Sequence, residues 1–406
     1  MTRTLEPARP EEVGLSAQGL AAVDAELQRF IDAGELAGAV TLVARRGRLV
    51  HQNAMGVKDL ASGEPLRTDT LFRIYSMTKP VTGVAMMILH DEGKWRPEDP
   101  IARHLPAFEG VKVFAGLDAG GAPILETPRR APTLRDLLTH TAGLSYGFDP
   151  NDPVDKLYIG AKVWGSASLG EMAGRIAALP LAYHPGEKWL YSLAMDVQGA
   201  IIEKLSGQSL PEFMRTRIFE PLGMTDTAFH TPPQKKARRA TIYRMSETRG
   251  LVPADLPMLP EAETPPAPAS GGGGLISSAG DYARFAQMLL NGGEFGGKRI
   301  VSAAALKLQM SNHLSDEILA GGYGIGLQQI RPGYGHGFDG AVFHDPDAAG
   351  IPVGKGTYQW DGAAGTWFWV DPVNDLLFVG LIQRMAFDSP PFQAITQKLM
   401  ARAIVD

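Results

Sequence analysis

The sequence predicts an α+β fold in which an antiparallel sheet, flanked by helices, carries an inserted and mostly helical second domain. Segments rich in β-formers lie near both ends of the chain, and a helical middle separates them. Strands from both ends are expected to share one sheet, which the first and last helices cover. The expected domains are residues 1–95 with 265–406 and residues 96–264, and a cleft between them is the natural place for a site.

The N-terminal part is expected to form a helix, a hairpin and a second helix. Over residues 16–36 the apolar residues recur at three- and four-residue steps, and Ser16 is the expected N-cap. Two β-rich runs then meet at the residues Arg45–Gly47, which predicts a hairpin. A further helix is expected near residues 76–93.

The remaining chain changes from a helical to a strand-rich pattern. From about 95 to 245 the pattern is mostly helical, with long loops. The stretch 253–268 holds six prolines and leads into the glycines at 271–274, so we expect a functional loop there, with a linker as the alternative. Two helices are then expected at 281–291 and about 303–313. Four strand-rich runs follow at 323–330, 356–360, 365–370 and 375–385, and a closing helix is expected at 391–405.

Composition excludes several classes of protein. The 39 basic and 44 acidic residues give a net charge of -5 without any Lys/Arg run, so nucleic acid and anionic membranes are poor candidate partners. Cysteine is absent, which excludes disulfide frameworks, thiolate metal sites and cysteine nucleophiles. The polar start and the lack of long apolar segments predict a cytoplasmic protein.

Two motifs lack the context that their usual chemistry requires. Gly143–Gly147 matches Gly-x-Ser-x-Gly, but a nucleophile elbow needs a strand before Ser145 and a helix after it, and neither is expected here. Gly335–Gly340 matches Gly-x-Gly-x-x-Gly, but no helix follows, so a β-turn region is predicted. The histidines show no metal-ligand spacing, and His140 is expected to bind nearby backbone.

A Ser-x-x-Lys motif at Ser76 and Lys79 has a more suitable context, because it opens an apolar helix. Residues three apart share a helix face, so both side chains are expected together at a helix N-terminus, where free N–H groups favour negative charge. A serine nucleophile needs a base, and a desolvated lysine with a lowered pKa can take that role. An N-capping serine beside a surface lysine is the structural alternative.

Two later motifs complete the candidate site. Tyr191, followed by Ser192 and Leu193, lies at a loop-to-helix junction, where a tyrosine beside a cation can relay a proton. The segment Trp360–Gly362 lies in the strand-rich tail, and a glycine there lets substrate approach the backbone closely. A buried aromatic side chain and a strand bulge are the structural alternatives for these two motifs.

In this order the three motifs resemble those of serine β-lactamases and penicillin-binding proteins, and most of all those of family VIII carboxylesterases and related acyltransferases. Connecting segments such as FRIYSMTKP, LRDLLTHTAGLSYG and GGGGLISSAGDYARF match too, so the resemblance runs from about residue 12 to the C-terminus. It implies an acylated Ser76 and a coupled acid–base pair of Lys79 and Tyr191. It also implies an oxyanion hole formed by the backbone N–H groups of Ser76 and Ala363. The expected substrate-binding residues are Trp360, Tyr146, Gly362 and Asp361.

The sequence departs from the lactamase pattern at positions that face the substrate. Leu193 stands where lactamases usually have Asn, and Trp360 with Asp361 replaces the cation and hydroxyl that hold a substrate carboxylate. A neutral ester is therefore expected to fit better than an anionic β-lactam. Related esterases usually have Gly at the Asp361 position, and its carboxylate has three open roles: facing away, binding backbone or repelling anions.

The sequence thus predicts a serine esterase that hydrolyses carboxylic, short-acyl esters and needs no metal or organic cofactor. An acyltransferase and a weak β-lactamase or D-amino-acid peptidase remain alternatives with the same site, and a non-catalytic ligand-binding homologue is the alternative from another class. The loops at 253–268 and at Tyr146 and Phe148 are expected to rim the cleft. The sequence leaves open whether Lys79 or Tyr191 takes the first proton, and it leaves the oligomeric state open.

Overall fold

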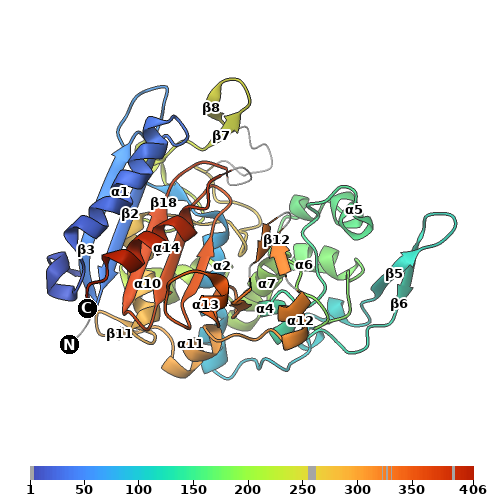
Figure 1. The fold of residues 1–406 in the computed structure, drawn as a ribbon. Helices are drawn as coiled ribbons and strands as arrows, with labels where there is room; N and C mark the ends of the chain where they lie inside the picture. The colour runs from blue at the N-terminus through green and yellow to red at the C-terminus, as the bar shows by residue number, and fades with distance from the viewer. Residues whose placement is uncertain (1–3, 255–261, 322, 326–327, 331, 386–388) are drawn as a thin grey trace.

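An eight-stranded sheet in the order β1-β3-β2-β18-β17-β16-β15-β14 forms the centre of the fold (Figure 1). The computed structural model describes residues 4–254, 262–321, 323–325, 328–330, 332–385 and 389–406. The strands are β1 (Glu6–Pro7), β2 (Gly38–Arg45), β3 (Arg48–Gly56), β14 (Tyr334–His336), β15 (Ala341–Phe343), β16 (Tyr358–Asp361), β17 (Trp367–Asp371) and β18 (Leu376–Leu381). The first strands of the chain meet the last ones where β2 pairs with β18, as predicted.

The sheet is antiparallel except for the short parallel pair β1–β3. The predicted hairpin is β2–β3, and it closes through Arg46 and Gly47 with φ angles of 54° and 73°. Positive φ at both central residues is the turn geometry that matches the twist of paired strands. The hairpin predicted from the local sequence is therefore confirmed.

Helices α1 (Ala17–Asp32) and α14 (Phe392–Ala403) lie side by side on one face of the sheet (Figure 1). The predicted N-cap Ser16 accepts a hydrogen bond from the N–H of Gly19 at 3.2 Å. Their apolar sides form one core cluster with side chains of the sheet such as Trp367 and Phe378. The prediction that the first and last helices cover the sheet is confirmed.

The opposite face of the sheet packs against α10 (Ala279–Leu290), behind which lie α2 (Thr78–Asp91) and α11 (Ala303–Gln309). Every residue of α2 from Thr78 to Leu89 is buried. A helix that is buried on all sides lies in the middle of a protein rather than at its surface. The largest core cluster continues from this sheet face into the helical middle, so α2 connects the two parts.

Helices dominate the middle of the chain, as predicted. They are α3 (Ile101–His104), α4 (Leu134–Leu138), α5 (Pro153–Gly160), α6 (Leu169–Ala177), α7 (Ala194–Ser206), α8 (Leu210–Met214) and α9 (Glu220–Leu222). The division into domains at 95/96 and 264/265 stays a prediction. Across the described ranges, no helix has the length and apolar character needed to cross a membrane.

The structure adds a hairpin that the sequence analysis missed, β5 (Val113–Leu117) with β6 (Pro123–Glu126), which projects from the body (Figure 1). Every residue of β6 is exposed, so this segment lacks the alternation of buried and exposed residues along the chain that marks a strand. Other small pairs are β4 (Phe72–Arg73) with β9 (Ile276–Ser277), β7 (Tyr243–Ser246) with β8 (Gly250–Pro253), and β10 (Glu294–Phe295) with β11 (Lys298–Arg299).

Two expected segments fall partly outside the described residues. The run 323–330 forms the separate pair β12 (Tyr323–Ile325) and β13 (Gln328–Ile330) rather than part of the main sheet, and residues 326–327 are outside the description. Of the proline-rich stretch 253–268, residues 255–261 are outside it. Short helices α12 (Asp316–Gly321) and α13 (Pro346–Ala349) complete the C-terminal half.

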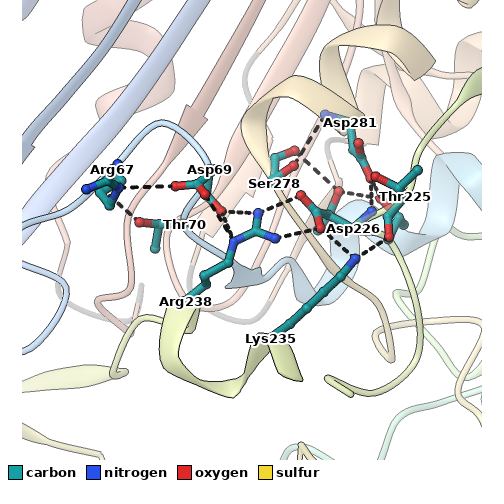
Figure 2. A network of polar contacts seen from close by, with 11 residues as sticks. Arg67, Asp69, Thr70, Thr225, Asp226, Lys235, Arg238, Ser278 and Asp281 are labelled. Carbon is teal, nitrogen blue, oxygen red and sulfur yellow. Dashed lines mark hydrogen bonds and ion pairs between the residues drawn. The ribbon is translucent and has the colours of Figure 1, made fainter. Parts of the chain in front are cut away.

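A network of charged side chains fastens the segment after α9 to the loop before β4 (Figure 2). Arg238 donates to the two carboxylate oxygens of Asp226 at 2.9 and 2.6 Å and also to the backbone carbonyl of Asp69. Lys235 donates to Asp226 at 2.8 Å, and Asp281 of α10 accepts from the N–H of Asp226 at 2.7 Å. Burial raises the pKa of Asp281 to about 6. The network thus holds the loop before β4, the segment after α9 and the start of α10 together.

Candidate active site

Ser76 lies on a sharp turn between β4 and α2. The turn is a single 3₁₀ turn, Tyr75–Met77, which leads directly into the helix. Tyr75 has a φ of 44°, and a left-handed conformation at a large non-glycine residue stores strain. The N–H of Met77 donates to the carbonyl of Ile74 at 3.0 Å. The predicted nucleophile is therefore half-buried and held at the N-terminal end of α2, on what we call the Ser76 turn.

The three predicted catalytic side chains lie together. Nζ of Lys79 is 3.1 Å from Oγ of Ser76, and the hydroxyl of Tyr191 donates to the same Oγ at 2.7 Å. Lys79 comes from the first turn of α2, and Tyr191 from the loop before α7, 115 residues after the serine. Both distances are short enough for direct proton transfer once the protonation states allow it.

Lys79 is fully buried, with 0% of its surface exposed. Its Nζ donates to the carbonyl of Gly272 at 2.7 Å, contacts the hydroxyl of Tyr146 at 3.4 Å and lies 4.6 Å from the ring centre of Tyr191. Burial lowers the pKa of Lys79 to about 7, against the opposing charge of nearby carboxylates. A neutral amine has two hydrogens and one lone pair, which matches two oxygen acceptors and the hydroxyl of Ser76.

Tyr191 and Tyr146 differ from Lys79 in the protonation state that burial favours. Burial raises the pKa of Tyr191 and that of Tyr146 above the ordinary value for tyrosine. Desolvation disfavours the charged form of any group, so it keeps a phenol protonated but makes a lysine neutral. The same burial therefore favours the neutral form of Lys79 and the protonated form of Tyr191.

The glycines at 271–274 pack against α2, a role that sequence analysis missed. The carbonyl of Gly271 accepts from the hydroxyl of Thr82 at 2.7 Å, and the carbonyl of Gly272 holds Lys79. A Cβ on Gly272 would lie 3.1 Å from both Asp196 Oδ2 and the hydroxyl of Tyr146. The four consecutive glycines were a signal of close backbone approach, but the sequence did not say to what.

Asp196 is a second residue that the sequence analysis did not single out. It lies in the first turn of α7 and is buried, and its Oδ1 accepts from the hydroxyl of Ser270 at 2.6 Å. Burial raises the pKa of Asp196, and its charge raises that of Lys79. An acidic residue inside an otherwise apolar helical run was the signal available in the sequence.

The end of β16 approaches the Ser76 turn closely. A Cβ on Gly362 would lie 2.3 Å from the carbonyl oxygen of Ile74, so only glycine fits there. The N–H of Gly362 donates to the carbonyl of Thr366 at 2.7 Å, which shapes the bend that follows the strand. The N–H groups of Ser76 and Ala363, the predicted oxyanion donors, have no hydrogen-bond acceptor in the described part of the chain.

Aromatic rings line the approach to Lys79. The ring of Tyr146 stacks on that of Phe148 at 4.3 Å and on that of Tyr191 at 5.1 Å. The ring centre of Trp164 lies 6.0 Å from that of Tyr146. Phe148 is 63% exposed and Trp164 is 42% exposed, so both present apolar surface to solvent. Trp360 is 5% exposed, and its ring lies 6.0 Å from that of Tyr191.

The motifs expected to be structural have structural partners. Ser145 is buried and donates to Asp155, which also accepts from the N–H of Asp149 at 2.8 Å. Nδ1 of His140 accepts from the N–H of Ser192 at 3.2 Å, so the prediction that it binds nearby backbone is confirmed. Gly335 and His336 end β14, and Gly337–Gly340 form the predicted turn that leads to β15.

Comparisons with known proteins identify the family of this chain. A family model described as Beta-lactamase matches residues 23–401. Protein Rv1367c of Mycobacterium tuberculosis is 40% identical to this chain over 370 residues, and the match covers 88% of each chain. Esterase EstB of Burkholderia gladioli is 33% identical over 377 residues, and that match covers 88% of this chain and 89% of EstB. The solved structure of EstCE1, described as a hydrolase with promiscuous acyltransferase activity, has a TM-score of 0.79 and 30% identity, over 96% of this chain and 99% of its own. The chain therefore belongs to the beta-lactamase family, as its motifs predicted.

Proposed function

We propose that this protein is a serine esterase that hydrolyses carboxylic esters through an acyl-enzyme on Ser76. The observation that carries the proposal is the pair of contacts to one hydroxyl oxygen, 3.1 Å from Nζ of Lys79 and 2.7 Å from the hydroxyl of Tyr191. The name of esterase EstB supports ester hydrolysis in a relative, and EstCE1, which shares the fold, is described as a hydrolase.

In the first half of the reaction, neutral Lys79 takes the proton of Ser76 as Oγ attacks the ester carbonyl. The N–H groups of Ser76 and Ala363 donate to the resulting oxyanion, and each such donor contributes about 3–4 kcal/mol to transition-state stabilisation. The intermediate then collapses, and the bond between the carbonyl carbon and the alcohol oxygen breaks. The proton held by Lys79 passes through the hydroxyl of Tyr191 to the departing alkoxide, which leaves as an alcohol.

In the second half, a water molecule attacks the carbonyl carbon of the acyl-enzyme and gives its proton to the same pair. The second tetrahedral intermediate expels Oγ of Ser76, which recovers that proton, and the carboxylic acid leaves. Short-acyl esters are the proposed substrates, and Trp360, Tyr146, Gly362 and Asp361 are the proposed residues that contact them. The two halves regenerate the starting protonation states, so the chemistry needs no cofactor.

Acyl transfer to an alcohol is the second candidate function, because EstCE1 is described as having promiscuous acyltransferase activity. The same acyl-enzyme then reacts with an alcohol in place of water. Adding an acceptor alcohol and comparing ester formation with hydrolysis separates the two, and nitrocefin turnover tests for β-lactamase activity. The cytoplasmic location and the restriction of partners to small-molecule esters stay predictions.

The experiment is the hydrolysis of p-nitrophenyl acetate and butyrate by the wild type and two variants, each checked for folding by circular dichroism. Ser76→Ala is expected to lose turnover, and Ser145→Ala is expected to keep it. If Ser145→Ala loses turnover and Ser76→Ala keeps it, the assignment of Ser76 as the nucleophile is wrong. If the folded wild type is acylated once without turnover, the non-catalytic alternative replaces the esterase.

A further inference from the structure

Asp361 places an exposed carboxylate beside the candidate active site. It is the last residue of β16, and it lies between the buried Trp360 and Gly362, the glycine that touches the Ser76 turn. The next residue, Ala363, carries one of the proposed oxyanion donors. Asp361 is close enough to Lys79 and Tyr191 to act on the charge state of both.

Among the residues that the structure describes, this carboxylate has no salt-bridge partner. Protein crowds it on several sides and raises its pKa to about 6, which is still below 7, and the side chain keeps access to solvent. Within the described residues it forms no ion pair within salt-bridge distance, and Lys79 is the cation that acts on it. Lys79 is buried and must be neutral to serve as the base, so it does not cancel this charge in the reactive state.

The other charged groups that act on Lys79 have the same sign as Asp361. They are the buried carboxyls of Asp196 and Asp339. Burial raises the pKa of both of these carboxyls, which favours their neutral forms, so the negative charge that a substrate meets here is the exposed carboxylate of Asp361. The exposed rings of Phe148 and Trp164 add aromatic faces, which attract an ammonium group and not a carboxylate.

We propose that Asp361 selects substrates by charge, so that the site prefers esters with a cationic group near the scissile bond and rejects anionic esters of similar shape. An ammonium group there gains a charged partner, whereas a carboxylate meets one of like sign. This inference rests on the proposed esterase function. Loss of the lactamase cation at Trp360 and Asp361 implies only that a neutral ester fits better than an anionic one. The charge of Asp361 adds a preferred substrate class, cationic esters.

The test compares kcat/KM for four aryl acetates that share one reacting bond. They are phenyl acetate, 3-carboxyphenyl acetate, 3-(trimethylammonio)phenyl acetate and its neutral isostere 3-tert-butylphenyl acetate. The wild type is expected to favour the ammonium ester over the tert-butyl ester and to disfavour the carboxylate ester against phenyl acetate. In Asp361→Asn the ratio of kcat/KM for the cationic to the anionic ester is expected to fall by about tenfold, as loss of one partly exposed charge implies.

Two further variants make the result decisive. Asp361→Lys is expected to reverse the preference, and Asp32→Asn, an exposed carboxylate at the end of α1 on the other face of the sheet, is expected to leave the ratio unchanged. If Asp361→Asn is folded and active but keeps the wild-type ratio, the charge-selection role is overturned while the esterase proposal stands. If the wild type hydrolyses none of the esters, the proposed function fails and this inference fails with it.

Discussion

Replacing Gly362 by alanine tests whether the close approach of β16 to the Ser76 turn builds the oxyanion hole. The new Cβ would lie 2.3 Å from the carbonyl oxygen of Ile74 and 2.4 Å from Oγ1 of Thr366. Since ordinary contact begins at 3.4 Å, the end of the strand must retreat by about 1 Å. The N–H of Ala363 follows directly and moves with it, away from the position where the oxyanion forms.

A displacement of this size has a large effect on chemistry. A displacement of a catalytic group by about 1 Å lowers the reaction rate on the order of 100-fold, and loss of one oxyanion donor lowers kcat by about 100- to 1000-fold. We therefore expect Gly362→Ala to lower kcat for p-nitrophenyl butyrate by about 100- to 1000-fold, with a smaller change in KM. Overpacking is also expected to lower the free energy of unfolding by about 1–3 kcal/mol, measured by urea denaturation.

The matched control is Gly174→Ala in α6, where nothing lies within 4 Å of the added Cβ. This variant is expected to keep wild-type kcat and to gain about 0.5–1 kcal/mol of stability, because alanine favours the helix. If Gly362→Ala is folded and its kcat stays within about threefold of the wild type, well short of the loss expected for one oxyanion donor, the reasoning is refuted.

Three other predictions follow from the site. Lys79 must be neutral to accept a proton, and its pKa is about 7, so kcat/KM is expected to be low at acidic pH and to increase as the pH rises through about 7. A flat profile from about pH 5 to 9 would contradict this assignment. Tyr191→Phe removes the donor 2.7 Å from Ser76 and is expected to lower kcat by about 100- to 10,000-fold, measured with p-nitrophenyl butyrate; a loss under about tenfold would argue against proton relay. Ser145→Ala removes the hydroxyl donor of buried Asp155 and leaves it the N–H of Asp149, so thermal unfolding should show a loss of about 1–3 kcal/mol in the free energy of unfolding while kcat stays near the wild type; the reverse pattern would give this serine a catalytic role.

Local patterns in the sequence predicted the elements whose geometry is local. The i,i+3 spacing of Ser76 and Lys79 implied neighbouring side chains, and they lie 3.1 Å apart. Helix α1 and the β2–β3 hairpin follow from apolar periodicity, an N-cap serine and turn residues. The β5–β6 hairpin was missed because its second strand is exposed throughout, so no buried face left a pattern in the sequence.

Contacts between distant segments needed the tertiary structure. The carbonyl of Gly272 accepts a hydrogen bond from Lys79 across 193 residues, and the charge of Asp196 in α7 acts on the pKa of the same amine. Neither interaction has a fixed spacing in the chain, because each depends on how distant segments pack together. The role of the four glycines was therefore visible only after the fold had brought them against α2.

The sequence by itself determined the α+β class, the order of the three motifs and the family, since these depend on residue type, periodicity and spacing. Only the tertiary structure decided the protonation chemistry of the site. The pKa of Lys79 falls to about 7 because the sheet, the helical middle and the glycine loop together exclude water from its amine. Desolvation is a property of everything that surrounds a group, and no stretch of sequence around residue 79 specifies it.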